Sequence, residues 1–243
     1  LPAGYSAIAH PSGAGELHAA STIPDTLIEE LKLRLWTTID PPRLTAPRAT
    51  HAVKVDGKLD DWADAKPIAD VNTAEHLGNN HHFGHQWSGA KDLSAQAWAN
   101  HDGRTLRIAV RVRDDRVREP DRLQLAFPRA WQSLREGEMA DRKFTIAAPA
   151  DGQATTRRIG QMEMAAAPTE GGYIVEASAP LSALKVKPGD SIGFHLLLSE
   201  QDFPEYELPK FRWNRTQQME WPINPWWNCL RDAQSAGELH LAE

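Results

Sequence analysis

The sequence predicts an all-β fold: an antiparallel β-sandwich, jelly-roll-like, that follows an N-terminal extension with one short helix. Three observations lead to this prediction. Short segments of alternating apolar and polar residues recur from residue 51 onward, turn pairs such as Asp56-Gly57 and Gly171-Gly172 stop them, and no long helical stretch separates them. Because strands with one apolar face and no crossover helices pair antiparallel, two such sheets are expected to bury these faces against each other.

Residues 1–50 are expected to form an extension or linker. The first 22 residues are rich in Ala, Gly, Ser and His and show no periodicity. Leu27, Leu31 and Leu35 then recur at helical spacing, which predicts the short helix. Prolines crowd the stretch 37–50 and favour an extended connector, so the main domain is predicted to span residues 51–243.

The main domain contains eight segments with strand character. They are 51–55, 93–99, 104–115, 121–127, 142–148, 172–180, 191–199 and 237–243. The alternation is clearest in 104–115, where Leu106, Ile108, Val110 and Val112 share one face and Arg107, Arg111 and Arg113 share the other. The apolar faces of these segments are the predicted core.

Composition and missing motifs exclude several function classes. A net charge of -6 argues against a nucleic-acid binder that neutralises phosphates. No apolar run approaches the roughly 20 residues that cross a bilayer, so no membrane span is expected. The single Cys229 excludes an internal disulfide and a multi-cysteine metal site. No hydrolase or phosphate-loop motif occurs and no carboxylate pair is singled out, which favours a binding domain over an enzyme.

The segment "WPINPWWNC", residues 221–229, is the strongest candidate for a ligand site. Its three tryptophans, Trp221, Trp226 and Trp227, can cover the C–H faces of sugar rings, while Asn224 and Asn228 can bind hydroxyls. The two prolines reduce the ordering cost of binding. Trp87, or Trp131, can supply a second aromatic face from another loop. The alternative is that one or two of these rings only close the end of the sandwich.

The order of several segments resembles the carbohydrate-binding module family 9. They are "VDGKLDDWADAKPI", "DLSAQAWANHDGRTLRIAVRVRDDRV", "DRLQLAF", "GGYIVEASAPLSALKVKPGDSIGFHLLLSEQD", the Trp/Asn-rich stretch and "AGELHLAE". The resemblance covers roughly residues 51–243. It implies a β-sandwich, commonly with structural calcium, in a secreted or periplasmic bacterial protein that acts on polysaccharides, with an upstream catalytic domain as a possible partner.

The resemblance also implies a site. Sugar-binding members hold a terminal sugar between two tryptophans, and the downstream one falls on Trp226 or Trp227, flanked by Asn224 and Asn228. At the upstream position this chain has no tryptophan, and Arg118 is the nearest residue. The family's ligand glutamate falls on Gln124.

Acidic turns are candidates for a calcium site. Asp56, Asp60 and Asp61 lie close together in "DGKLDDW", and Asp114 and Asp115 follow the clearest strand. Calcium takes about 6–8 oxygen ligands from carboxylates and loop carbonyls. The alternative is that these residues only form turns and caps.

The predicted function is a non-catalytic carbohydrate-binding domain that binds a polysaccharide or oligosaccharide by aromatic stacking. Three alternatives stay open: a glycan-active enzyme domain, a haem-binding domain with Met or His as axial ligands, and a structural module on the same fold. The arginine stripe can bind acidic sugars or pair with neighbouring carboxylates. The histidines between 76 and 85 can line a pocket or bind a metal.

Overall fold

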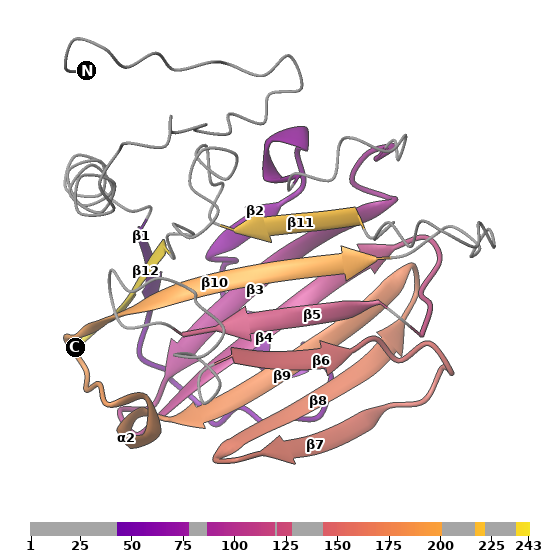
Figure 1. Ribbon diagram of the computed structural model, residues 1–243. Coiled ribbons are helices and arrows are strands. Elements are labelled where there is room, and N and C mark those ends of the chain that lie inside the picture. Colours follow the sequence, from indigo (N-terminus) through magenta and orange to yellow (C-terminus); the bar gives the residue numbers. More distant parts are fainter. Residues whose placement is uncertain (1–42, 78–86, 120, 128–142, 201–216, 222–236) are drawn as a thin grey trace, which may run out of the picture.

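The computed structural model describes residues 43–77, 87–119, 121–127, 143–200, 217–221 and 237–243. Within these residues the chain forms two sheets that pack face to face, with very little helix (Figure 1). The predicted all-β sandwich is therefore confirmed. The helix expected around Leu27–Leu35 lies outside the described residues.

The front sheet of Figure 1 has the strand order β1-β12-β10-β5-β6, and β11 pairs with β10. Its strands are β1 (Arg43–Ala46), β12 (Gly237–Leu241), β10 (Ser191–Glu200), β5 (Arg122–Ala126), β6 (Lys143–Ala147) and β11 (Gln217–Trp221). All pairings are antiparallel except that of β1 with β12. β1 belongs to this sheet although the sequence places its residues in the extension.

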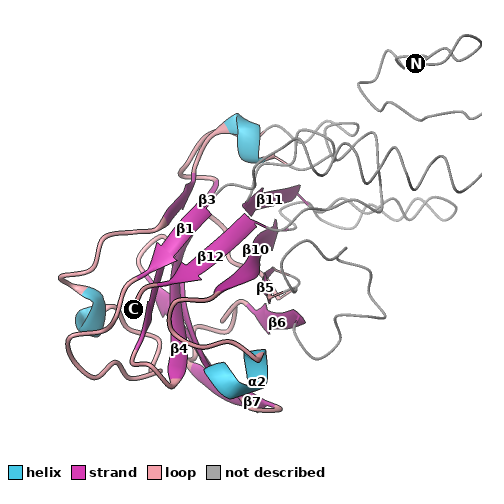
Figure 2. Ribbon diagram, turned by 90° about the vertical axis from the view of Figure 1, so that its left-hand side faces the viewer, coloured by secondary structure: helices cyan, strands magenta, loops and turns pink. Residues whose placement is uncertain are grey.

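The back sheet has the strand order β2-β3-β4-β9-β8-β7, and every pairing is antiparallel. Its strands are β2 (Ala69–Val71), β3 (Leu93–His101), β4 (Thr105–Asp114), β9 (Gly172–Pro180), β8 (Met162–Thr169) and β7 (Thr155–Ile159). The described helices are the short η1 (Asp60–Trp62), η2 (Ala74–His76) and α2 (Leu181–Leu184). None of them is long and apolar enough to cross a membrane. Figure 2 shows the two layers from the side.

The core lies between the sheets and follows the predicted alternation. The inward residues of β4, from Leu106 to Val112 in steps of two, are at most 2% exposed. They face the alternate residues of β10, from Ile192 to Leu198, which are equally buried. Because the side-chain period of a strand is two, this pattern fixes which face of each strand is buried.

The predicted strand at 51–55 does not form. Val53 instead packs on the outer face of the back sheet with Trp62, Trp98 and Ala109, in a second apolar cluster. The backbone N–H groups that follow donate to the side chain of Glu176 rather than to a neighbouring strand. The segment thus covers part of the outer face of the back sheet.

Gly172, in the predicted Gly171-Gly172 turn, stands at the start of β9 in a position that only glycine fits. Its φ is +144°, and a Cβ atom here would lie 2.1 Å from the carbonyl oxygen of Val112. Only glycine allows β9 to approach β4 so closely at this point.

Candidate functional site

The outer face of β5, β6 and β10 carries polar side chains in register. Gln124 on β5 lies between Thr145 on β6 and Leu197 on β10. Its neighbours Leu123 and Leu125 are fully buried, so Gln124 points outward, and its Nε2 atom donates to Thr145 Oγ1 at 3.2 Å. The predicted ligand residue Gln124 is therefore half-buried on the outer face of the front sheet.

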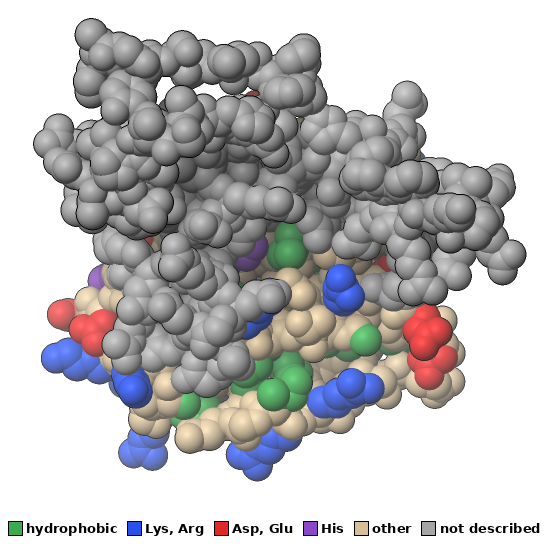
Figure 3. Space-filling model, in the orientation of Figure 1, with side chains coloured by type: hydrophobic (Ala, Val, Ile, Leu, Met, Phe, Trp, Pro, Cys, Tyr) green, Lys and Arg blue, Asp and Glu red, His purple; other side chains and the backbone are tan. Residues whose placement is uncertain are grey.

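The described side chains of this face are basic or neutral. The next row holds Ser199, Arg122 and Ala147, and the row on the other side holds His195, Ala126 and Lys143. The Nε atom of Arg122 is buried and has no hydrogen-bond partner among the described residues. Where Figure 3 shows this face uncovered, Lys and Arg groups are visible on it and acidic groups lie mainly at its margins. Thr145 is exposed, and Gln124, Arg122 and Lys143 are half-buried, so these four described side chains are the hydrogen-bond donors that the face presents.

The predicted tryptophan loop starts and ends beside this face. Trp221 pairs with Leu196 of β10, and Gly237 pairs with Phe194, two residues away. The two anchor points are thus about 7 Å apart along β10, the strand next to β5. Asn224, Trp226, Trp227 and Asn228 lie outside the described residues, as does the side chain of Trp221.

Trp87 packs against the core of the sandwich. Its ring is partly buried against the core, and its Nε1 atom donates to the carbonyl of Leu93 at 2.7 Å. A buried indole that has its hydrogen-bond partner is typical of a packing residue. The structure does not bring Trp87 to the row of Gln124, because Leu93 lies on the back sheet.

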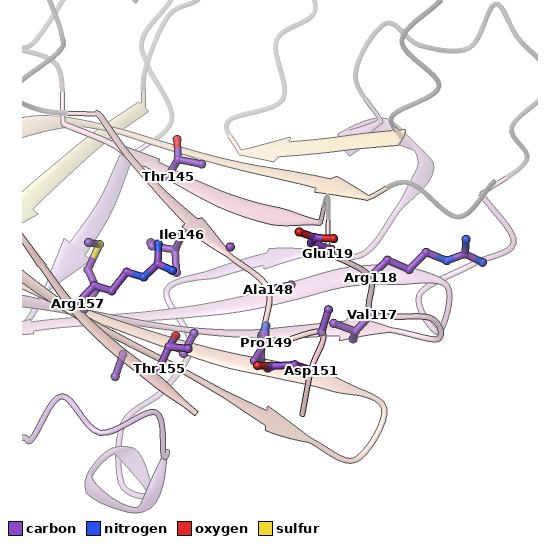
Figure 4. A pocket seen from close by; sticks show the side chains of 15 residues that line it. Val117, Arg118, Glu119, Thr145, Ile146, Ala148, Pro149, Asp151, Thr155 and Arg157 are labelled. Atoms are coloured by element: carbon purple, nitrogen blue, oxygen red, sulfur yellow. The ribbon is translucent and has the colours of Figure 1, made fainter. Parts of the chain in front are cut away.

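A cavity of about 680 Å³ lies at the edge of the sandwich, between β6 and the pair β7–β8. Arg118, a candidate ligand residue from the sequence, lines it together with Thr145, which is also the hydrogen-bond partner of Gln124. The backbone N–H of Arg118 donates to Asp121 Oδ2 at 2.5 Å. In Figure 4 the Arg118 side chain points away from the other labelled lining residues, whereas Arg157 of β7 points toward them. Gln124 thus contacts Thr145, whereas Arg118 shares only the lining of the cavity with it.

The first acidic turn is held by a buried carboxylate that the sequence did not single out. Glu176 of β9, 1% exposed, accepts the backbone N–H groups of Asp56, Gly57 and Lys58. It also accepts the indole N–H of Trp62 at 2.7 Å. Burial raises the pKa of Glu176, although these hydrogen bonds act in the opposite direction.

Two of the three predicted calcium ligands in this turn accept backbone N–H groups. Asp56 Oδ1 accepts the N–H of Lys58, Asp61 Oδ2 accepts the N–H of Lys54, and Asp60 is exposed in the first turn of η1. These contacts are turn chemistry.

Asp114 and Asp115 lie in a separate place, at the end of β4. Glu176, which holds the first acidic turn, pairs with Ala109. Ala109 is five positions before Asp114, so the first turn and Asp114 are about 16 Å apart along β4. Asp114 Oδ1 accepts the N–H of Arg116. In the described part of the chain, no three His, Cys, Asp or Glu residues group in a way that holds a metal ion. The five aspartates do not converge, and calcium binding stays a prediction.

Several residues on which the alternative functions depend have structural roles in the described part of the chain. Arg107 pairs with Asp102 at 2.6 Å, and Arg111 lies 5.9 Å from the ring centre of Trp98. His76 is buried with Nδ1 at 3.0 Å from Thr73 Oγ1, and burial lowers its pKa. Three of the four methionines in the chain, Met162, Met164 and Met219, are buried in the core.

Sequence reasoning missed Arg122, Thr145 and the edge cavity. Arg122 and Thr145 occupy the outward positions of predicted strands, so the alternation already marked them as exposed. What it could not give is the order of the strands, which makes these two residues neighbours of Gln124.

Comparisons with known proteins complete the description of the site. Residues 55–242 match the family described as carbohydrate family 9 binding domain-like. Among solved structures, a carbohydrate-binding module of family 9 from Caldicellulosiruptor kristjanssonii in complex with glucose is 16% identical, with a TM-score of 0.49; the match covers 82% of this chain and 95% of that chain. The complex of such a module from the same organism with cellotriose is also 16% identical, with a TM-score of 0.47 and coverage of 82% and 93%. The search of curated proteins found no match.

Proposed function

Because the chain belongs to the carbohydrate family 9 binding domain-like family, we propose that it is a non-catalytic domain that binds an oligosaccharide on the outer face of β5, β6 and β10. In this proposal Gln124, Thr145 and Arg122 bind the sugar hydroxyls. Trp226 and Trp227, flanked by Asn224 and Asn228, cover the sugar rings from the loop between β11 and β12.

One observation carries the proposal: the outward Gln124–Thr145 pair lies beside the two anchor points of the tryptophan loop. Sugar recognition needs a flat apolar surface for C–H groups and a few fixed polar groups for hydroxyls. The loop sequence supplies the first and the sheet face supplies the second. Sheet strands also hold polar groups more rigidly than loops do.

The domain is proposed to act in a secreted or periplasmic bacterial protein, where it keeps a catalytic domain near its polysaccharide. Calcium is proposed to hold loops in place. Both statements rest on the family, and chelation followed by a thermal melt tests the second. A melting temperature unchanged by chelator at neutral pH would argue against bound calcium.

Calorimetry against a panel of gluco-, xylo- and manno-oligosaccharides tests the binding proposal. The Trp226→Ala, Trp227→Ala double variant is expected to lose binding, because stacking on two indoles is removed. Gln124→Ala is expected to weaken binding about tenfold, the effect of losing roughly one hydrogen bond of 1.4 kcal/mol.

Gln96→Ala is the matched control for Gln124→Ala. Gln96 lies on β3, whose outward residues face the other side of the sandwich, and it is equally half-buried. Its replacement should leave affinity unchanged. Full affinity in the double tryptophan variant, or no binding to any glycan, would refute the proposal.

A further inference from the structure

Among the described residues, no strand of the front sheet covers the inner face of the edge strand β7. Residues paired across two strands share a face, and Arg157 pairs with Met164 and Thr155 with Ala166. Met164 and Ala166 are at most 2% exposed, whereas Arg157 is exposed and Thr155 is half-buried. β6 is the last strand of the front sheet and contacts β8, so the front sheet ends one strand before the back sheet does.

The cavity lies where the back sheet extends one strand beyond the front sheet. Its volume of about 680 Å³ is within the size range of ligand sites. Ile146, Ala148 and Met164 form an apolar part of its lining, and Thr145, Thr155 and Arg157 add polar groups (Figure 4). In the described part of the chain Arg157 forms no salt bridge, so its guanidinium donors are available to a ligand.

The charges of the lining decide which ligand chemistry fits. Glu119 and Asp151 bring two carboxylates and Arg157 brings a guanidinium, whereas the guanidinium of Arg118 points away from the cavity. The balance disfavours a strongly charged ligand, because either sign would meet like charges. A neutral molecule with many hydroxyl groups uses both kinds of partner, since each hydroxyl donates and accepts.

Thr145 connects this cavity with the sheet face. It lines the cavity and accepts the hydrogen bond from Gln124. From Gln124 to Arg157 the path crosses one strand spacing and the gap between two sheets, on the order of 15 Å. A ligand that uses both places must therefore be longer than one sugar ring.

We propose that the edge cavity is a second saccharide subsite, continuous with the sheet face, so that the domain binds a chain of several neutral sugars with Arg157 and Thr155 at its far end. This inference rests on the proposed function of the sheet face. The alternative is that a protein strand binds the edge of β6 that no described strand pairs with. The mixed polar lining of β7 favours the glycan. A strand bound beside β6 would bury the charge of Arg157, and burying an unpaired charge is costly.

Calorimetry with a ladder from mono- to hexasaccharide of the best glycan in the panel tests this. The intact domain should bind the longer sugars at least tenfold more tightly than the monosaccharide. Arg157→Ala should remove most of this gain and leave monosaccharide affinity unchanged. Arg158→Ala is the matched control, because Arg158 is the next residue of β7 and its side chain points to the opposite face.

A second measurement does not depend on a variant. The methyl resonance of Met164, which lines the cavity, should shift with the longer sugars and not with the monosaccharide. Equal affinity for all chain lengths, or an Arg157→Ala variant with the full gain, would overturn the subsite while the sheet-face site stands. No binding of any sugar would overturn both. A dimer in solution that Thr145→Pro dissociates would assign the edge to protein pairing and would also overturn the subsite.

Discussion

Replacing Glu176 by alanine should destabilise the domain more than almost any other polar substitution. The carboxylate accepts four N–H groups, with donor–acceptor distances of 2.8 Å from Asp56, 2.7 Å from Gly57, 3.3 Å from Lys58 and 2.7 Å from Trp62. Asp56 and Lys58 are exposed, so water can replace the carboxylate there. Gly57 and Trp62 are buried, so their N–H groups would be left without partners.

The magnitude follows from these two orphaned donors. Each buried donor without an acceptor costs about 1–3 kcal/mol, so Glu176→Ala should lower the free energy of unfolding by about 4 kcal/mol. Burial of the charge offsets part of the carboxylate's benefit, which agrees with its raised pKa. Glu176→Gln should cost about 2 kcal/mol, because one oxygen remains and the amide NH₂ faces a donor.

Urea unfolding at pH 7, followed by tryptophan fluorescence and circular dichroism, measures this loss. Glu163→Ala is the matched control. Glu163 lies on β8, one strand from β9, and it is exposed. Its replacement should change stability by less than about 0.5 kcal/mol. A loss below about 1 kcal/mol for Glu176→Ala would refute the view that this carboxylate holds the cover on the back sheet.

Two further predictions concern turns. Asp102 accepts N–H groups from Arg104 and Thr105 and a hydrogen bond from Arg107; burial alone would raise its pKa, but these bonds lower it from 3.8 to about 2. A depressed folded-state pKa stabilises above the unfolded value, so Asp102→Asn should cost about 1 kcal/mol at pH 7, allowing for a side chain that is 41% exposed. In urea melts this cost should shrink as the pH falls from about 4 to about 2, and a cost at pH 2 as large as that at pH 7 would contradict the reasoning. Gly172→Ala should lower the free energy of unfolding by about 3 kcal/mol or prevent folding, because its Cβ atom would meet the Val112 carbonyl. The control Gly160→Ala, with φ of +59° and open space around it, should cost only about 1 kcal/mol, and equal losses would contradict the close-approach argument.

The sequence was most informative where burial alternates along a strand. Leu106 to Val112 and Ile192 to Leu198 follow the period of two, because each strand has one face in the core. The same rule failed at 51–55, where Val53 packs on an outer sheet face and the backbone is held by a side chain. The partner of this segment, Glu176, is more than 100 positions away, so no local pattern announces it.

The candidate site shows the same limit. The outward positions of Gln124 and Thr145 follow from alternation, but their neighbourhood requires the antiparallel register of β5 and β6 across the connection of residues 127–142. The edge cavity depends on one sheet ending a strand before the other, which is a property of the strand order alone.

The two outer faces of the sandwich differ in a way that supports the proposed site on the front sheet. On the back sheet the segment from Val53 to Trp62 lies across the outer face and packs on Trp98 and Ala109, fixed there by Glu176. Trp62 is 3% exposed and Trp98 is 7% exposed, so the indole rings on this face are buried and cannot stack on a sugar. On the front sheet the outward positions of β5 and β6 hold Arg122, Gln124 and Thr145, side chains suited to hydroxyl groups. Opening the back face by Glu176→Ala should therefore reduce stability without weakening the proposed glycan binding by the fraction that remains folded. Gln124, Thr145 and Arg122 lie on the opposite sheet, and Arg157 and Thr155 lie on the inner face of β7, away from the outer face that Glu176 holds closed.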